Sequence, residues 1–203
     1  MRAAVAVIGA GLAYLAAKSQ RNSRDQQAVI EFRAYRYRKE GDDPEGKIDL
    51  SAPAMLSRSE VEQYCKALSK VQEYTDEAAK SVNARELREN KYMSASQYGT
   101  AVHKALKDII EALKSNPYNL SAEISFAKTQ EVNYGTKDSI RIDVHEPLRP
   151  ITLCVYDIKT GDEARNIVSP TRAAEIAKNM TEKGYIRLLI TEIRSRVPRN
   201  PPF

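Results

Sequence analysis

An acid and an amine stand two positions apart at the end of an apolar stretch of this 203-residue sequence. The stretch spans residues 153–159 and ends in Asp157-Ile158-Lys159, before a turn at Thr160-Gly161. In a strand, side chains at i and i+2 point to the same face, so Asp157 and Lys159 would lie side by side. A charged side chain removed from water is costly unless it is paired or binds a metal. The pair therefore predicts chemistry at the end of a buried strand.

A second carboxylate, Asp143, lies on the segment 140–144, where apolar and polar residues alternate. This alternation predicts a strand with Arg141 and Asp143 on the face opposite its three apolar residues. If the two strands are neighbours, Asp143 and Asp157 converge at one end of a sheet. Two carboxylates with a backbone carbonyl and waters suit Mg²⁺. Lys159 beside such a site can orient or deprotonate an attacking water, or stabilise negative charge on a phosphate.

A histidine, His103, follows Gly99 by one turn on a segment whose apolar residues recur at helical spacing. A single histidine beside the apolar face of a helix is more often a structural residue than a ligand, and both interpretations stay open here. The sequence holds one other histidine, His145. This scarcity excludes most routes to zinc-dependent or Ser-His chemistry.

The helices that would position His103 follow from apolar spacing and capping signals. Ser59, with Glu62 three residues later, is a candidate N-cap for a helical region from Ser57 to about Arg88, with or without a break. A second helix is expected from about Ser94 to Lys114, where Asn116-Pro117 ends it. Residues 57–114 are therefore expected to be the helical part of the molecule.

The strands follow in the second half of the chain. Segments at 122–126 and 140–144 alternate with period two, and a third strand is expected at 151–159 after a proline-containing turn. These three are expected to form an antiparallel meander. A helix from Ser169-Pro170, closed by Gly184, then leads to a last strand at 185–193. This order predicts an α/β sandwich with a mixed sheet.

Composition narrows the class of partner and the state of the cysteines. The formal net charge of +5 favours a polyanionic partner, such as nucleic acid or an anionic membrane surface. Cys65 and Cys154 have no CxxC or Cys/His spacing, so neither a zinc site nor a disulfide framework is indicated. Two reduced thiols are expected.

The first 50 residues are expected to be an extension ahead of a main domain at 51–203. An uncharged, weakly hydrophobic run from Ala3 to Ala17 is shorter than the roughly 20 apolar residues of a membrane-spanning helix. It is interpreted as a linker or amphiphilic helix, with a signal peptide as the alternative. Arginine and tyrosine interleave from Phe32 to Lys39, which suits either a solvated amphipathic segment or contacts with nucleic acid. A loop at Gly41–Gly46 marks the boundary.

Four segments follow one another in a fixed order: Gly99-x-x-x-His103, the segment 122–126 with Glu123, Ser139–Val144 with Asp143, and Val155–Gly161. This order resembles that of the PD-(D/E)XK nucleases, and the nearest subgroup resembles the RecB nuclease domain. The resemblance covers about Ser94 to Glu192, and the DIKTG string is its most specific element. It implies a restriction-endonuclease-like α/β sandwich with a catalytic core at 94–193, preceded by a helical N-terminal region.

The resemblance implies a role for each matched residue. Asp143 and Asp157 would bind Mg²⁺, with Mn²⁺ as an alternative, and Lys159 would assist catalysis. His103 would contact metal or substrate, and Glu123 would place a charge near the site. The last helix has Arg172, Glu175 and Asn179 where the family usually has a Gln followed by a Tyr. The candidate substrate contacts are Arg141, Thr160 and Arg172. The implied activity is hydrolysis of phosphodiester bonds in DNA.

The surrounding sequence looks like the nuclease domain of bacterial polymorphic toxins. This likeness implies a secreted effector that is cytoplasmic in the producing cell before export and acts in the target-cell cytoplasm. It also implies a cognate immunity protein and a secretion-system carrier or larger parent polypeptide, with no stable transmembrane anchor. One alternative is a housekeeping RecB-like nuclease for DNA repair or processing. Another is a non-catalytic nucleic-acid-binding module or membrane-associated adaptor.

Overall fold

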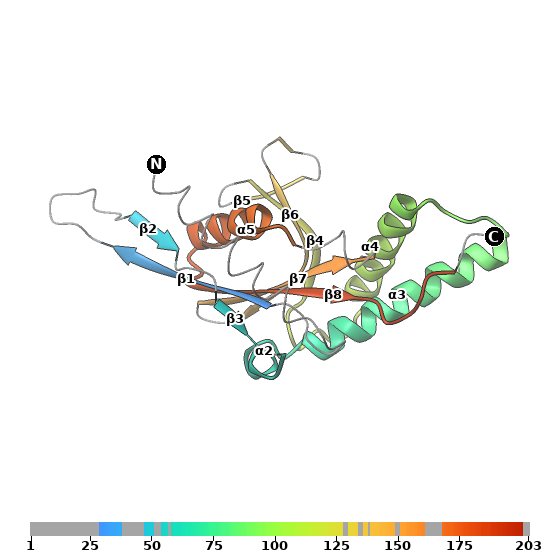
Figure 1. Ribbon diagram of the computed structural model, residues 1–203, viewed down its shortest axis with the longest axis horizontal. Coiled ribbons are helices and arrows are strands. Elements are labelled where there is room, and N and C mark those ends of the chain that lie inside the picture. The colour runs from blue at the N-terminus through green and yellow to red at the C-terminus, as the bar shows by residue number, and fades with distance from the viewer. Residues whose placement is uncertain are drawn as a thin grey trace.

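The computed structural model describes residues 29–37, 47–50, 54–56, 58–127, 130–133, 136–137, 139–148, 151–160 and 168–200. These residues form an α/β structure in which helices pack on both faces of a mixed sheet (Figure 1). The predicted apolar run at 3–17 and the predicted loop at 41–46 lie outside them. In the described part of the chain, no helix is long and apolar enough to cross a membrane.

The sheet is mixed, as the sequence predicted. Within the described residues its strands are β1 (Val29–Tyr37), β2 (Lys47–Leu50), β3 (Ala54–Leu56), β4 (Ser121–Ala127), β5 (Gln130–Val132), β6 (Ile140–Leu148), β7 (Thr152–Lys159) and β8 (Arg187–Arg194). Their order is β2-β1-β8-β7-β6-β4-β5, with β3 paired to β1. β4, β6 and β7 pair in antiparallel succession, which confirms the predicted meander, and β8 runs parallel to β7. The short strand β5 was not predicted.

The described helices lie where helical spacing predicted them, at α2 (Arg58–Tyr64), α3 (Leu68–Glu89), α4 (Ala95–Glu111) and α5 (Pro170–Glu182). α4 begins on a complete capping box, because the Ser94 hydroxyl accepts from the Gln97 N–H and the Gln97 side chain accepts from the Ser94 N–H. Ser169 caps α5, and Gly184 follows this helix with a φ of 98°. The predicted cap at Ser59 is misplaced, since α2 begins at Arg58.

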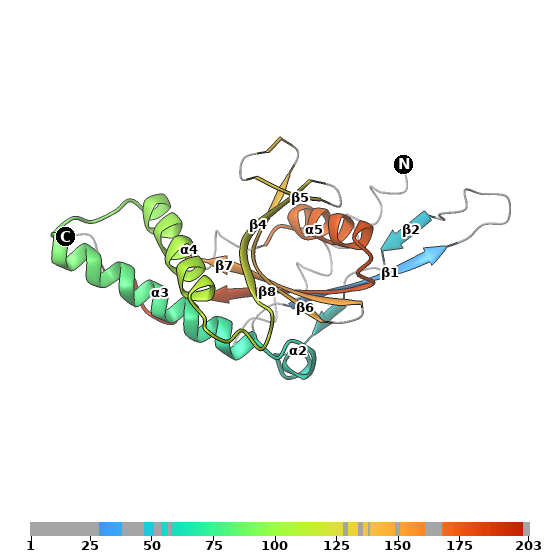
Figure 2. The same ribbon diagram turned by 180° about the vertical axis from the view of Figure 1, so that it is seen from behind.

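Two hydrophobic clusters lie on opposite faces of the sheet. On β7, Cys154, Tyr156 and Ile158 pack with α3 and α4, whereas Leu153 and Val155 pack with α5. Figure 2 shows α3 and α5 on opposite sides of the strands. Because alternate residues of a strand share a face, Asp157 and Lys159 belong to the α5 face of β7.

The strands β4 and β6 change faces beside the candidate site. Ala122 and its partner Val144 belong to the cluster under α3 and α4, but Phe126 and Ile142 belong to the cluster under α5. Strict alternation would keep the even-numbered residues of each strand on one face. The change occurs at Glu123, whose φ of 55° bends β4. The predicted single apolar face of β6 is therefore wrong.

Cys65 and Cys154 form a disulfide, with their Cα atoms 5.9 Å apart. The prediction of two reduced thiols is therefore wrong. Motif spacing does not reveal the bond, because the two cysteines are 89 positions apart and meet only when the helical region packs on β7. Beside the bond, the buried carboxylate of Glu146 accepts hydrogen bonds from the Tyr156 hydroxyl at 2.5 Å and from the Ala67 N–H at 3.2 Å. These contacts fix the break between α2 and α3 against the sheet.

Strands β1 and β2 come from the predicted N-terminal extension. β1 pairs antiparallel with β8 through Val29–Arg33, and β2 pairs antiparallel with β1. The backbone of this segment thus continues the sheet beyond β8. The predicted Arg/Tyr segment begins on β1, and its side chains lie outside the description.

Candidate metal centre

Three side chains from three different elements meet at the bend of β4. His103 of α4 has its Nδ1 2.9 Å from Oε1 of Glu123 and 3.6 Å from Oδ1 of Asp143. One ligand atom from each of the three residues lies within 4.8 Å of the other two. Asp143 and Glu123 are 7% and 14% exposed, so the group is largely shielded from water. This arrangement offers two carboxylates and an imidazole to one small cation.

Close packing between α4 and β7 brings the histidine to the sheet. A Cβ atom on Gly99 would lie 2.8 Å from Oγ1 of Thr160, so this position requires glycine while Thr160 keeps its orientation. One helical turn later the same face of α4 presents His103. Gly99 therefore allows the close approach of α4 to the end of β7.

The bend of β4 brings the carboxylate of Glu123 to His103. Glu123 is a residue other than glycine with a positive φ inside a strand, a conformation that costs free energy and is often found at functional sites. The bend interrupts the alternation of β4, so that Ala122 and Ile124 pack with opposite clusters and Glu123 contacts His103. The φ values of individual residues cannot be read from apolar spacing.

A second group, formed by Asp157, Lys159 and Arg172, adjoins the first. Lys159 Nζ lies 2.6 Å from Oδ2 of Asp157, which confirms that the two side chains share a face of β7. Arg172 of α5 approaches Oδ1 of Asp157 at 3.3 Å and donates a hydrogen bond to the backbone carbonyl of Arg141 at 2.8 Å. Asp157 is 2% exposed, so both cations compensate a buried charge.

Asp143 connects the two groups. Its Oδ2 accepts a hydrogen bond of 2.8 Å from the backbone N–H of Ile158, the residue between Asp157 and Lys159. Burial, together with the negative charge of Asp157, raises the pKa of the Asp143 carboxyl to about 6. Asp143 and Asp157 therefore repel one another electrostatically, as expected for two carboxylates that lie near one another at one end of the sheet.

The partners of His103 and Glu123 favour the charged forms of both residues. Burial lowers the pKa of His103, but the hydrogen bond to Glu123 and the charge of Asp143 outweigh it and raise that pKa above its ordinary value. Burial raises the pKa of Glu123, but His103 and the nearby Arg141 outweigh it and lower that pKa. A cation that binds here would replace the proton of His103.

The donor set fits a hard or borderline divalent cation. Carboxylate oxygens suit Mg²⁺ and Mn²⁺, and an imidazole nitrogen suits Mn²⁺ better than Mg²⁺. Among the described residues, the buried Oδ2 of Asp157 receives no hydrogen bond, although Lys159 is close to it. The group of Cys65, Glu146 and Cys154 is no comparable site, because its thiols are joined in the disulfide.

The three candidate substrate contacts have partners within the site. Arg141 Nε lies 3.1 Å from Oε2 of Glu123, Arg172 is held by Asp157, and Thr160 packs against Gly99. Sequence reasoning missed Arg194, which stands opposite Lys159 on the parallel strand β8. Both strands end in an acid, an apolar residue and a base, which are Asp157-Ile158-Lys159 on β7 and Glu192-Ile193-Arg194 on β8. This repetition in the sequence could have identified Arg194.

Comparisons of the chain with models of known protein families, with curated protein sequences and with solved structures find no significant match.

Proposed function

We propose that this protein is a divalent-metal-dependent nuclease that hydrolyses phosphodiester bonds in DNA, built on the restriction-endonuclease-like core of the PD-(D/E)XK family. The observation that carries the proposal is the convergence of His103, Glu123 and Asp143 beside the Asp157–Lys159 ion pair. A mixed sheet with helices on both faces is consistent with that core. The basic net charge of the chain favours a polyanionic substrate.

His103, Glu123 and Asp143 would hold the cation, and Asp157 adjoins them through Asp143. When bound, a divalent cation supplies a Lewis acid for the phosphate oxygen and lowers the pKa of a coordinated water. The chain's own residues supply position and charge. Glu123 orients the His103 ring through its hydrogen bond at Nδ1. Arg172 fixes the Asp157 carboxylate, because its guanidinium donates one hydrogen bond to Oδ1 of Asp157 and another to the Arg141 carbonyl.

Lys159 is the residue assigned to the reacting phosphate. Its side chain is 19% exposed and its ammonium is held 2.6 Å from Asp157, so it carries a localised positive charge at the edge of the site. Three N–H donors allow it to keep Asp157 as a partner while donating to a phosphate oxygen or to the attacking water. A cation in this place stabilises the negative charge that develops in the transition state.

Replacement of Lys159 by alanine tests the assignment. We expect Lys159→Ala to reduce cleavage of plasmid DNA by at least about a hundredfold, because a preorganised charge at the reacting phosphate is lost. The measurement is the initial rate with Mg²⁺, alongside circular dichroism to verify folding. Lys178→Ala removes an exposed lysine from α5 and serves as the matched control, with near-normal rates expected. Unchanged cleavage by folded Lys159→Ala protein would refute the proposal.

Metal dependence gives an independent test. We expect chelation by EDTA to stop cleavage, and Mn²⁺ to restore it at lower concentration than Mg²⁺, because His103 offers a nitrogen ligand. His103→Ala should reduce the advantage of Mn²⁺ over Mg²⁺. Cleavage that persists in EDTA would contradict a metal-dependent mechanism. Binding of DNA without cleavage in any divalent metal would instead favour the non-catalytic binding module.

We further propose that the chain acts as an exported antibacterial effector, neutralised by a cognate immunity protein. The Cys65–Cys154 disulfide supports exposure to an oxidising compartment, since structural disulfides are rare in reducing cytosol. Overproduction in a bacterial host without a partner gene should cause DNA loss and death, and Asp157→Asn should abolish both. Survival of the host with an active nuclease inside would favour a housekeeping role.

A further inference from the structure

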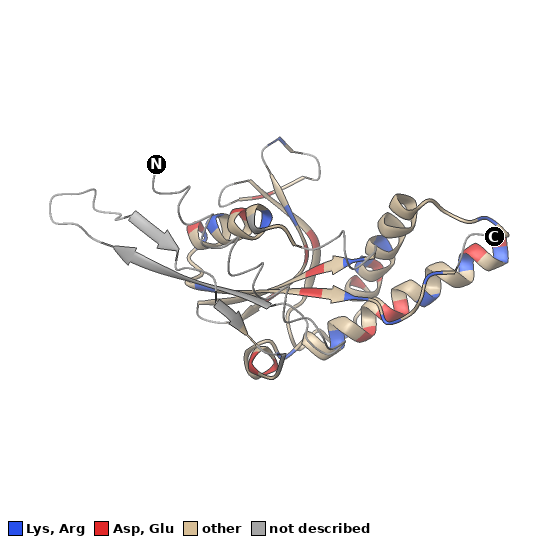
Figure 3. Cartoon of the chain, viewed as in Figure 1, with Lys and Arg blue, Asp and Glu red and all other residues tan. Residues whose placement is uncertain are grey.

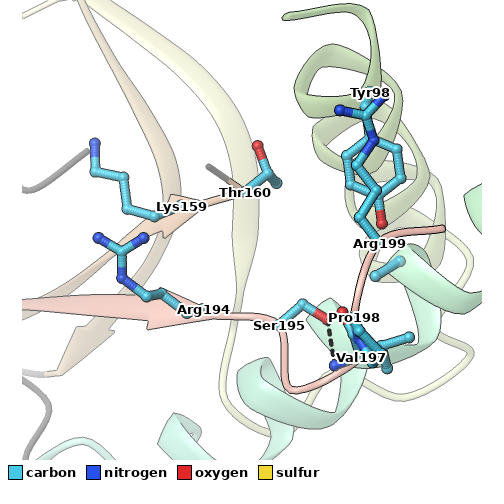
Figure 4. A pocket seen from close by; sticks show the side chains of 9 residues that line it. Tyr98, Lys159, Thr160, Arg194, Ser195, Val197, Pro198 and Arg199 are labelled. Atoms are coloured by element: carbon cyan, nitrogen blue, oxygen red, sulfur yellow. Dashed lines mark hydrogen bonds between the residues drawn. The ribbon is translucent and has the colours of Figure 1, made fainter. Parts of the chain in front are cut away.

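A pocket of about 210 Å³ opens beside Lys159, at the ends of β7 and β8 (Figure 4). Its walls come from the ends of β7 and β8, from α3 and α4, and from the segment that follows β8. The polar residues that line it are Tyr98, Lys159, Thr160, Arg194, Ser195 and Arg199. The pocket is several times larger than the roughly 30 Å³ that one water occupies in the liquid.

The described residues give this pocket a positive charge. Among them, its lining includes Lys159, Arg194 and Arg199 and no acidic side chain. Lys159 and Arg194 are register partners on the parallel strands β7 and β8, and Figure 4 shows their side chains next to each other. Figure 3 shows the same sequence of acidic and then basic residue near the end of each strand. The acids behind these cations are Asp157 and Glu192.

Arg199 is held in place from two sides. Its guanidinium lies 4.9 Å from the centre of the Tyr98 ring and donates to the carbonyl of Met93. Its Nε is buried and meets no acceptor among the described residues. A buried donor without an acceptor is costly, so an anionic ligand that reached it would gain a charge-assisted hydrogen bond. Ser195 also lines the pocket, and its hydroxyl accepts a hydrogen bond of 3.0 Å from the Val197 N–H.

We propose that this pocket binds a backbone phosphate of the nucleic acid strand, next to the phosphate at which cleavage occurs. The inference rests on the proposed function, because Lys159 lines the pocket and also pairs with Asp157, which adjoins the candidate metal centre. Arginine forks and hydroxyl donors are the groups that recognise phosphate oxygens. The pocket would fix the position of the strand relative to the metal centre, since phosphate contacts set register without reading sequence.

Binding without cleavage tests the pocket. The probe is a short fluorescent oligodeoxynucleotide, titrated in EDTA at several salt concentrations with the full chain. Arg194→Gln and Arg199→Gln should each weaken binding about tenfold, the effect of losing one charged hydrogen bond. Each should also reduce the slope of log affinity against log salt by about one. Arg196→Gln is the matched control, because it removes the same charge from the same segment but lines no part of the pocket.

A second measurement needs no variant. Inorganic phosphate added to the wild-type protein should shift the backbone amide resonances of Thr160 and Ser195, and it should compete with the oligonucleotide. An RNA strand of the same sequence distinguishes a general backbone contact from one restricted to DNA. Shifts with phosphate but no competition would identify a free-phosphate site, which overturns the proposal.

The outcomes separate the pocket from the nuclease proposal. Equal losses of binding affinity in Arg196→Gln and Arg199→Gln would reveal only a general charge effect and would overturn the pocket proposal. If both pocket variants bind the oligonucleotide as wild type does, while cleavage still depends on Lys159, the pocket proposal is overturned and the nuclease proposal stands. Pocket-dependent binding by a chain that cleaves nothing with Mg²⁺ or Mn²⁺ would leave the pocket and remove the nuclease. If Arg199→Gln fails to fold, the binding affinity of Arg194→Gln alone tests the pocket proposal.

Discussion

At the scale of single residues, Asp143 is the point where the two groups of the site meet. One of its oxygens faces His103, and the other accepts the N–H of Ile158. Burial and the charge of Asp157 make its ionised form less favourable than that of an ordinary carboxyl. A divalent cation would offset that effect, because an opposite charge nearby favours the carboxylate. The site is therefore arranged to accept positive charge.

Gly99 gives a prediction about packing. An added methyl group would lie 2.8 Å from the Thr160 hydroxyl, so Gly99→Ala should displace Thr160 beside Lys159 and lower the cleavage rate about tenfold. Removing the obstructing hydroxyl with Thr160→Ala should restore part of the loss. A double-mutant cycle on unfolding free energies in urea should show coupling of about 1 kcal/mol. Additive effects would contradict a direct contact.

His145 gives a prediction about pH. Burial, with a small effect of Lys183, lowers the pKa of this histidine to about 4 from its usual value near 6.5. The folded state therefore resists protonation of His145. Its contribution to the free energy of unfolding is complete above pH 6.5 and disappears as pH falls to 4. We expect wild-type protein to lose roughly 3 kcal/mol of unfolding free energy relative to His145→Gln across this window.

The comparison with His145→Gln isolates this contribution, because other groups titrate in the same window. The raised pKa of Asp143 acts in the opposite direction, since its protonation favours the folded state. Urea unfolding in EDTA at several pH values measures both proteins. Parallel pH profiles for wild type and variant would show that His145 carries no such effect.

At the scale of elements, α5 does more than connect the parallel strands β7 and β8. Its first turn carries Arg172, which joins the Asp157 carboxylate of β7 to the Arg141 carbonyl of β6. The helix thereby sets the spacing of two strands that each carry a candidate metal ligand. The Ser169 cap and the proline at the first helical position fix where this turn begins.

Arg172→Lys tests this bridge. Lysine keeps the charge but loses the planar fork that makes two separate bonds, so we expect kcat to fall about tenfold. The unfolding free energy should change by less than about 1 kcal/mol, because Arg172 is partly exposed. Lys178→Arg makes the reverse exchange on the exposed side of α5 and should leave both quantities unchanged. A wild-type kcat for Arg172→Lys would show that the bridge does not orient Asp157.

Sequence patterns predicted the elements better than the contacts between them. The caps at Ser94 and Ser169 and the alternation at 140–144 are local, so α4, α5 and β6 were predictable. The bend at Glu123 was not, because a positive φ in a residue other than glycine leaves no trace in apolar spacing. The same holds for the disulfide, which depends on the packing of distant segments. The grouping of His103 with Glu123 also required tertiary structure.

At the scale of the whole molecule, the disulfide joins the helical region to the strand that carries the candidate catalytic pair. It links Cys65, between α2 and α3, to Cys154 in the buried centre of β7. A cross-link across 89 positions restricts the unfolded chain more than a short one would. The stability of the site and that of the helical region are therefore coupled.

We expect the double variant Cys65→Ala/Cys154→Ala to lose about 2–4 kcal/mol of unfolding free energy. Urea titration with and without dithiothreitol measures this, and the reductant should destabilise only the wild-type protein. Thiol titration of unreduced, denatured wild-type protein should find no reactive thiol. Two reactive thiols under those conditions would show that the bond does not form.

If the chain acts as the proposed nuclease, the bend at Glu123 places catalysis and stability in opposition. Glycine would adopt a φ of 55° without steric cost, yet it would remove a carboxylate from the candidate metal centre. A screen for heat-resistant variants should therefore return Glu123→Gly, and a screen for DNA cleavage should reject it. The residue that best fits the backbone is thus the one that the proposed function forbids, a local trade-off between stability and activity.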